Sequence, residues 1–191
     1  MALLRDGVSV APARWADLGA GEGAFTLALA DLLGPGARIT AVDRDGGALR
    51  RIASEMGRRF AATSLDVVVA DFTRPLALSS LDGVVMANSL HFVRDKRPVL
   101  EAVRTMLRPG GTLIVVEYGA DRGNPWVPHP FSYPSWEKMA VAAGFEGTRL
   151  LGTYPSRFLG SLYSSATQVP PLPARRGRGV GAGASTNADE T

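Results

Sequence analysis

The sequence predicts an α/β fold, in which helices cover both faces of a mostly parallel sheet of about seven strands. Apolar runs of strand length alternate with segments of helical periodicity, and turns rich in glycine and proline separate them. The chain of 191 residues is also long enough to bury one sizeable core. Right-handed crossovers would make this a doubly wound, Rossmann-like arrangement of three layers, with its ligand beyond the carboxyl ends of the strands.

The individual elements follow from their length and periodicity. Short apolar runs between turn signals are predicted as strands at residues 14–18, 38–42, 65–70, 82–87, 112–117, 146–151 and 158–167. Apolar residues at spacings of three and four predict helices at residues 25–33, 45–60, 96–107 and 133–143. The Gly-Pro-Gly run at 34–36 ends the first helix, and the Pro-Gly-Gly run at 109–111 ends the third and opens the fifth strand.

Residues 1–168 are expected to form one domain, and residues 169–191 a disordered tail. The tail is dominated by proline, glycine and small residues, which cannot bury enough apolar surface to fold. Its basic residues Arg175, Arg176 and Arg178 could contact phosphates, but a short charge run is more often a solvated segment.

Composition excludes several classes of function. The chain has no cysteine, so disulfides, iron–sulfur clusters, Cys-ligated zinc and thiol nucleophiles are ruled out. Two histidines leave little material for a metal site, and none is expected. The net charge of +3 is small for a nucleic-acid binder. Since the sequence lacks a long apolar span and a leader pattern, we expect a soluble cytoplasmic protein, either a monomer or a homodimer.

A glycine-rich loop follows the first predicted strand. From residue 17 to residue 23 it reads Asp-Leu-Gly-Ala-Gly-Glu-Gly. Glycines at every second position exceed the needs of a plain turn, and they let the backbone approach a ligand at the start of a helix. Read as Gly19, Gly21 and Ala24, the loop could hold the pyrophosphate of a dinucleotide.

Read from Asp17 to Gly23, the same loop resembles motif I of the class I methyltransferases, which bind S-adenosylmethionine. A carboxylate two residues before Gly19 would repel a pyrophosphate and would suit the ammonium group of a methionine moiety. The resemblance extends over residues 14–168 and implies the methyltransferase strand order, in which the last strand is antiparallel. The family positions that it assigns to the cofactor are Asp17, Gly19, Ala20, Gly21, Gly23, Asp43, Arg44, Asp71, Phe72, Asn88 and Ser89.

Each later strand end has an expected role in this resemblance. Asp43, with Arg44 beside it, would accept the ribose hydroxyls, a role that a dinucleotide would use equally; Asp45 is the better candidate for a helix cap. Asp71 would meet the adenine amino group and Phe72 would pack on the ring. Asn88 would contact the methionine part, and Ser89 beside it is also assigned to the cofactor.

His91 is the candidate catalytic residue, because an imidazole can take a proton from an acceptor near neutral pH. Two further features stay open. Glu117 and Tyr118 together face the acceptor pocket, or Glu117 lies at the surface. Residues 121–132, with Trp126, His129 and Phe131, form either a small lid or a loop anchored by one aromatic side chain.

The expected function is methyl transfer from S-adenosylmethionine to an oxygen, nitrogen or carbon nucleophile of a small molecule, by in-line displacement. One alternative is an NAD(P)-dependent oxidoreductase, although no Tyr-x-x-x-Lys pair is present: Arg122 follows Tyr118, and Glu137 follows Tyr133, at that spacing. Another is a partner protein that binds the cofactor without catalysis. RNA methylation guided by the basic tail is a third alternative.

Overall fold

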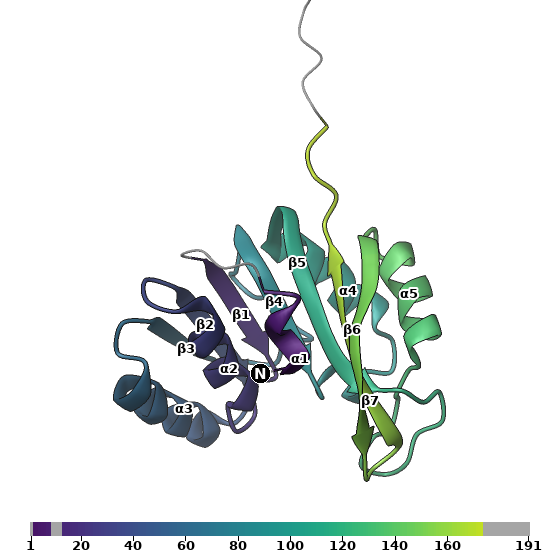
Figure 1. The fold of residues 1–191 in the computed structure, drawn as a ribbon, viewed down its shortest axis with the longest axis horizontal. Helices are drawn as coiled ribbons and strands as arrows, with labels where there is room; N and C mark the ends of the chain where they lie inside the picture. The colour runs from purple at the N-terminus through teal and green to yellow at the C-terminus, as the bar shows by residue number, and fades with distance from the viewer. Residues whose placement is uncertain (1, 9–12, 174–191) are drawn as a thin grey trace, which may run out of the picture.

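The computed structural model describes residues 2–8 and 13–173, which contain a sheet of seven strands (Figure 1). The strands are β1 (Arg14–Leu18), β2 (Arg38–Asp43), β3 (Ser64–Val69), β4 (Leu81–Ala87), β5 (Leu107–Tyr118), β6 (Glu146–Ser156) and β7 (Gly160–Gln168). Their order is β3-β2-β1-β4-β5-β7-β6. The pairs among β1 to β5 are parallel, and β7 is antiparallel to β5 and β6. This confirms the predicted fold class and the antiparallel last strand.

Helices cover both faces of the sheet, as predicted. They are α1 (Ala2–Arg5), α2 (Ala24–Leu33), α3 (Gly46–Arg59), α4 (Arg97–Met106) and α5 (Tyr133–Ala142), with a short 3-10 turn η1 (Leu90–Phe92). One apolar cluster joins α1, α2 and α3 to one face of the sheet, and a second joins α4 and α5 to the other. The sequence did not predict α1, because four residues are too few to show helical periodicity.

The connection between β3 and β4 contains no helix, although doubly wound folds usually cross over through one. Residues 70–80 follow an irregular path, and Leu76 and Leu78 pack against the cluster that contains α4 and α5. This irregular crossover therefore covers part of the sheet that a helix would otherwise cover.

β5 begins at Leu107, earlier than the predicted start at residue 112. The turn signal was misleading because the Pro-Gly-Gly run is itself paired with neighbouring backbone. Gly110 N–H donates to Val169 O at 2.9 Å, and Val169 N–H donates to Gly111 O at 2.9 Å. A register shift between Leu81 and Gly83 accommodates the extra residues of β5.

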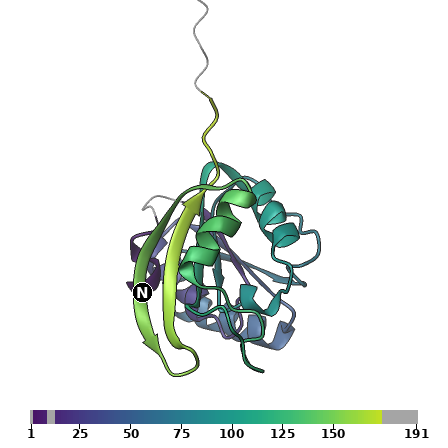
Figure 2. The same cartoon turned by 90° about the vertical axis from the view of Figure 1, so that its right-hand side faces the viewer.

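β6 and β7 form a long hairpin at one end of the sheet, with α5 beside it (Figure 2). The prediction placed Phe158 in the last strand, and this is wrong: Phe158 lies in the turn between the strands, where its side chain is 64% exposed. Its apolar ring resembles strand composition in sequence, but Gly160, with φ of 77°, starts the returning strand two residues later.

The carboxyl ends of the five parallel strands meet at one edge of the sheet, at the bottom of Figure 1, while the chain after β7 leaves from the opposite edge. Residues 170–173 of the predicted tail contain no helix or strand, and residues 174–191 lie outside the described residues. Within the described part of the chain, no helix is long and apolar enough to cross a membrane.

Candidate active site

The glycine loop follows β1 and leads into α2. In space it lies against the loop after β4. Gly19 has a φ of 83°, and a Cβ atom at this position would lie 2.5 Å from the Cβ of Ser89. Only glycine therefore allows the first loop to lie against the loop after β4. Gly23 supports helix packing instead, because a Cβ atom there would lie 2.5 Å from Ile52 Cγ1.

A cavity of about 210 Å³ opens between this loop and the ends of β2, β3 and β4. Its lining consists almost entirely of residues that the sequence singled out at separate strand ends. They are Gly19, Gly21, Asp43, Arg44, Ala70, Phe72, Asn88, Ser89 and Phe92. The fold thus brings seven of the predicted cofactor positions to one cavity, and it adds Ala70 and Phe92, which the sequence did not assign to the cofactor.

Asp43 connects the glycine loop after β1 with the loop after β2. Its Oδ2 accepts a hydrogen bond from Gly21 N–H at 2.8 Å, and its Oδ1 accepts one from Asp45 N–H at 2.9 Å. Each carboxylate oxygen keeps capacity for another donor, so the group can still accept two hydroxyls. Asp45 caps α3 as predicted, by accepting from the N–H groups of Gly47 and Ala48.

Asp17 lies beneath the glycine loop and is not part of the cavity wall. Its side chain is 1% exposed, and its Oδ2 accepts a hydrogen bond from Thr26 Oγ1 at 2.6 Å. Burial raises the pKa of Asp17 to about 6. Ala20, also nearly buried, is held by its N–H, which donates to Val42 O at 3.0 Å. Both residues therefore shape the loop from behind.

Arg44 lines the cavity, whereas Asp71 does not: it stands between the lining residues Ala70 and Phe72, with its side chain 3.9 Å from that of Arg44. The Oδ1 atom of Asp71 accepts from Thr73 N–H at 2.9 Å and from Thr73 Oγ1 at 2.7 Å. These bonds hold the pKa of Asp71 below its usual value, so it is a carboxylate at neutral pH. Phe72, the next residue, presents an aromatic side chain to the cavity itself.

Asn88 is a polar residue of the cavity wall whose side chain lacks a partner. Its backbone is left-handed, with φ of 51°, and its N–H donates to Val116 O at 2.8 Å. The Oδ1 atom is buried and has no hydrogen-bond partner among the residues described. A buried acceptor is rarely left unsatisfied, so this atom fits a ligand that brings a donor, such as an ammonium group or a hydroxyl.

His91 and Glu117 form a buried pair beside the cavity. Glu117 has no exposed surface, so the structure removes the surface alternative for this residue. Its Oε1 accepts from the backbone N–H groups of Ser89 at 3.2 Å, Leu90 at 2.8 Å and His91 at 3.2 Å. Its Oε2 lies 2.7 Å from Nδ1 of His91. A carboxylate only accepts, which assigns the ring proton to Nδ1 and leaves Nε2 as an acceptor.

The sequence placed Glu117 either at the acceptor pocket or at the surface, and it did not predict that Glu117 pairs with His91. Its contact with His91 joins residues 26 positions apart, which no local pattern reveals. The signal that could have found it is its place: it stands at the carboxyl end of the strand next to β4, where the fold predicts chemistry.

A row of aromatic rings leads from the cavity to the β6–β7 turn. The ring of His91 lies 4.3 Å from that of Phe92 and 5.5 Å from that of Tyr118, and Tyr118 lies 6.3 Å from Phe158. The two outer members are exposed, Phe92 by 61% and Phe158 by 64%. This row gives the edge of the sheet an apolar surface next to His91.

The loop between β5 and α5 lies beside this row. Phe131 is buried against the core and Trp126 is 72% exposed, so one aromatic side chain anchors the loop while another projects into solvent. The backbone N–H of His129 donates to His91 O at 3.0 Å. The loop therefore contacts the residue that carries the candidate base.

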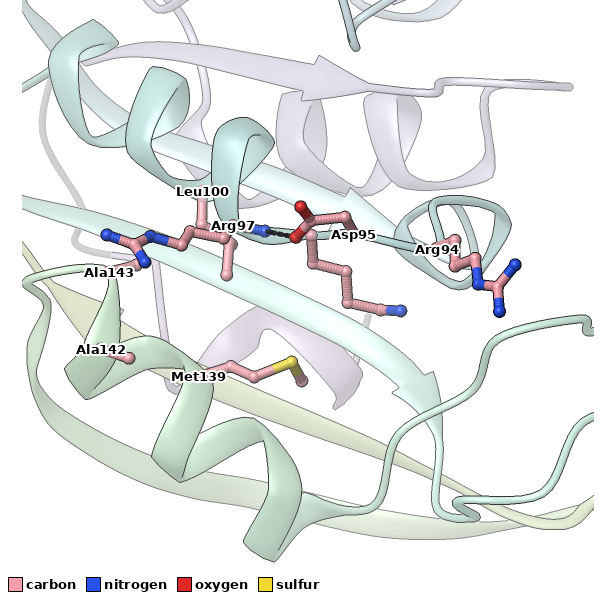
Figure 3. Close-up of a pocket in the computed structure, with 8 residues that line it drawn as sticks. Arg94, Asp95, Arg97, Leu100, Met139, Ala142 and Ala143 are labelled. Carbon is pink, nitrogen blue, oxygen red and sulfur yellow. Dashed lines mark hydrogen bonds between the residues drawn. The ribbon is translucent and has the colours of Figure 1, made fainter.

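A second cavity of about 210 Å³ lies between α4 and α5 (Figure 3). Leu100, Met139, Ala142 and Ala143 contribute its apolar wall, and the charged residues 94–97 line its other side. No residue that the sequence assigned to the cofactor lines this cavity. Its equal volume shows that size alone does not identify the site; the convergence of strand ends does.

Comparison with known proteins identifies the family. The model of the methyltransferase domain family matches residues 16–115. The chain belongs to the S-adenosylmethionine-dependent class I methyltransferases. This membership decides between the two interpretations of the glycine loop, in favour of S-adenosylmethionine and against a dinucleotide.

Individual relatives agree with this assignment. The chain is 35% identical over 103 residues to an uncharacterized methyltransferase of Mycobacterium tuberculosis, a match that covers 53% of this chain and 49% of that protein. It is 26% identical over 163 residues to a reducing polyketide synthase of Penicillium, covering 73% of this chain and 7% of the synthase. The chain thus spans about half the length of the mycobacterial relative and a small part of the polyketide synthase.

A solved structure shows the same fold. It is the 1,6-didemethyltoxoflavin N1-methyltransferase of Burkholderia thailandensis, determined with 1,6-didemethyltoxoflavin and S-adenosylhomocysteine bound. The two folds superpose with a TM-score of 0.67 at 19% identity, over 83% of this chain and 72% of that one. At this identity the likeness concerns the fold.

Proposed function

We propose that this chain transfers the methyl group of S-adenosylmethionine to a nucleophilic oxygen, nitrogen or carbon atom of a small molecule. The observation that carries the proposal is the buried His91–Glu117 pair directly beside a cavity lined by Asp43, Phe72 and Asn88. The cavity suits a nucleoside with an amino-acid moiety, and the His91–Glu117 pair suits removal of a proton. The bound cofactor supplies a methyl group on a sulfonium, which is a good leaving group.

The cavity residues divide the cofactor between them. Asp43 accepts the ribose hydroxyls, while Phe72 packs on the adenine, whose amino group meets Asp71, the residue before Phe72. The unpartnered Oδ1 of Asn88 accepts from the methionine end, next to Ser89. Gly19, Ala20 and Gly21 give the backbone room, with Arg44 in the cavity wall and with Asp17 and Gly23 supporting the loop from behind.

The acceptor approaches from the side of the aromatic row. His91 Nε2 takes the proton that the nucleophile loses, and Glu117, bonded to Nδ1, stabilises the imidazolium that forms. Tyr118 and the exposed rings of Phe92 and Phe158 contact the apolar part of the acceptor. The bound small molecule of the Burkholderia enzyme supports an acceptor of this size class.

Substitution of Asp43 tests the cofactor site. We expect Asp43→Ala to weaken the binding of S-adenosylhomocysteine by about 1–3 kcal/mol, because charge-assisted hydrogen bonds to a ligand are lost. Isothermal titration calorimetry on the full chain measures this. Asp31→Ala, which removes an exposed carboxylate on α2, is the matched control and should leave affinity unchanged. Equal affinities in all three proteins would contradict the assignment.

Mass spectrometry tests the transfer itself. Small-molecule extracts incubated with the protein and a cofactor carrying a deuterated methyl group should yield a labelled product. For an acceptor that must lose a proton, His91→Gln should lower kcat by about 10²–10⁴-fold and leave the affinity for S-adenosylhomocysteine close to that of the wild type. A labelled product formed at the wild-type rate by the His91→Gln protein would rule out the role of His91 as the base.

A further inference from the structure

Lys96 is a buried cation immediately before α4. Lys96 is only 7% exposed, although lysine is seldom buried without partners. The chain has two lysines and nineteen arginines, so this position holds one of its rare ammonium groups. An ammonium has three donors on one atom and can bridge oxygens that converge on a point.

The Lys96 ammonium joins two segments of the candidate site. Its Nζ donates to Val93 O at 2.9 Å and to His129 O at 2.9 Å, and it lies 4.9 Å from the ring centroid of Phe131. Val93 follows His91 by two residues in the loop after β4, whereas His129 and Phe131 belong to the loop between β5 and α5. One ammonium therefore contacts two loops that no strand pairing connects.

These contacts continue to the candidate base. The N–H of His129, whose carbonyl Lys96 binds, donates to the carbonyl of His91 at 3.0 Å. From the sheet side, Glu117 holds the ring of His91 through Nδ1 at 2.7 Å. His91 is thus held through its backbone by the loop that Lys96 also contacts, and through its ring by Glu117.

Nearby carboxylates offset part of the cost of burying the Lys96 ammonium. Burial lowers the pKa of Lys96 from its usual value, while the carboxylates of Glu117 and Asp95 oppose that shift. Lys96 thus supplies positive charge close to the carboxylate behind His91. Lys96 also lines the cavity between α4 and α5 with Leu100 and Met139, which a methionine of similar length would do equally well.

We infer that Lys96 is a positioning residue: its ammonium holds the loop between β5 and α5 against the loop after β4, and so keeps His91 where Glu117 can hold its ring in the tautomer whose Nε2 is free. Its relevance to methyl transfer rests on the proposed function. The loop contact and the tautomer can be measured without knowledge of the acceptor.

The test compares Lys96→Met, which keeps the stem and removes the charge, with Lys96→Arg, which keeps the charge. Lys138→Met, at an exposed position of α5, is the matched control. The full chain, saturated with S-adenosylhomocysteine, is labelled with ¹⁵N-histidine. Only His91 and His129 then give imidazole signals, and His129→Asn assigns them. Hydrogen exchange of the His129 amide reports the contact between the loops.

We expect the wild type and Lys138→Met to show one Nδ1–H tautomer of His91 and a protected His129 amide. In Lys96→Met, exchange at His129 should be at least about tenfold faster, as loss of a hydrogen bond to a charged donor implies, and His91 should lose its single tautomer. Lys96→Arg should restore at least part of both signals. A role limited to packing predicts that Lys96→Met leaves both unchanged, and that result would overturn the inference.

If Lys96→Met does not fold, as judged by its thermal unfolding, Lys96→Arg decides. A folded arginine variant that retains the single tautomer and the slow exchange supports the inference, and one that has lost both overturns it. Calorimetry with S-adenosylhomocysteine on the wild type separates the two proposals. A wild type that does not bind this compound contradicts the proposed function, while the same NMR spectra, recorded without the compound, still test the role of Lys96.

Discussion

At the scale of single residues, the carboxylates near the glycine loop differ in role because they differ in burial. Asp43 faces the cavity and binds backbone N–H groups of two loops. Asp17, only two residues before the first glycine, is buried and receives one hydrogen bond from Thr26. Burial disfavours the charged form of this carboxylate more than hydrogen bonding from Thr26 favours it, which is why its pKa rises to about 6.

Asp17 should make the stability of the protein depend on pH. Its pKa is higher in the folded chain than the usual 3.8, so the stability that it contributes is present below pH 4 and is lost as the pH rises through about 6. We therefore expect Asp17→Asn to stabilise the protein by about 1–3 kcal/mol at pH 7.5, since the amide can still accept from Thr26. The gain should shrink steadily towards pH 4.

Urea unfolding of both proteins across this pH range measures the effect, with Asp31→Asn as the exposed control. A stabilisation that does not vary with pH would show that burial of a charge is not its cause. The same variant tests whether Asp17 supports the glycine loop or contacts the ligand. Because Asp17 lies behind the loop, the affinity of Asp17→Asn for S-adenosylhomocysteine should stay close to that of the wild type.

At the scale of elements, the loops after β1 and β4 form the site by lying against each other. Ser89 Oγ donates to Leu18 O at 2.9 Å, and Gly19 lies against the Ser89 side chain. The N–H groups of Ser89, Leu90 and His91 all converge on Glu117 at the end of β5. Three strand ends are thereby held in one geometry before any ligand binds, which favours a preorganised site.

Substitution of Gly19 should disrupt this contact. Gly19→Ala places a Cβ atom 2.5 Å from Ser89 Cβ on a backbone with φ of 83°. We expect a loss of about 1–3 kcal/mol in the free energy of unfolding, because the backbone is strained and the loops must separate. Binding of S-adenosylhomocysteine should weaken by more than tenfold. Denaturant unfolding and calorimetry measure the two effects.

Gly57→Ala is the matched control for this substitution. Gly57 lies within α3, and a Cβ atom there would meet nothing within 4 Å. Alanine is a better helix former than glycine, so this variant should be as stable as the wild type or slightly more so. If both variants were equally stable and bound the ligand equally well, the close approach of the two loops would not matter for the site.

At the scale of the whole molecule, the two edges of the sheet have different roles. The carboxyl edge carries the cavity, the His91–Glu117 pair and the aromatic row. The amino edge carries the departing chain, where the backbone of Val169 still pairs with Gly110 and Gly111. This separation follows from the antiparallel direction of β7, which returns the chain away from the site.

Removal of residues 174–191 should therefore leave the cofactor site intact. We expect the shortened chain to bind S-adenosylhomocysteine with unchanged affinity, because the last described residues leave from the edge opposite the cavity. Calorimetry at low and high salt provides the measurement. A parallel titration with an RNA oligonucleotide tests the alternative of RNA methylation, since binding through Arg175, Arg176 and Arg178 would weaken steeply with salt and disappear on truncation.

The sequence by itself determined the fold class and most of the cavity lining. Strand and helix periods, together with the glycine loop, are local signals, and the rule that ligands bind at the carboxyl ends of parallel strands connects them. Asp43, Phe72 and Asn88 could be placed in this way because each lies at or shortly after the end of a strand that its own composition reveals. The cap at Asp45 is likewise local.

Only the tertiary structure decided the rest, because those features depend on contacts between distant residues. Glu117 is a partner of His91 rather than a surface carboxylate since β5 lies next to β4. The early start of β5 depends on Val169, and the ammonium of Lys96 has its role only because the loop carrying His129 folds back onto it. Local composition records none of these distances, so the packing of the whole chain had to supply them.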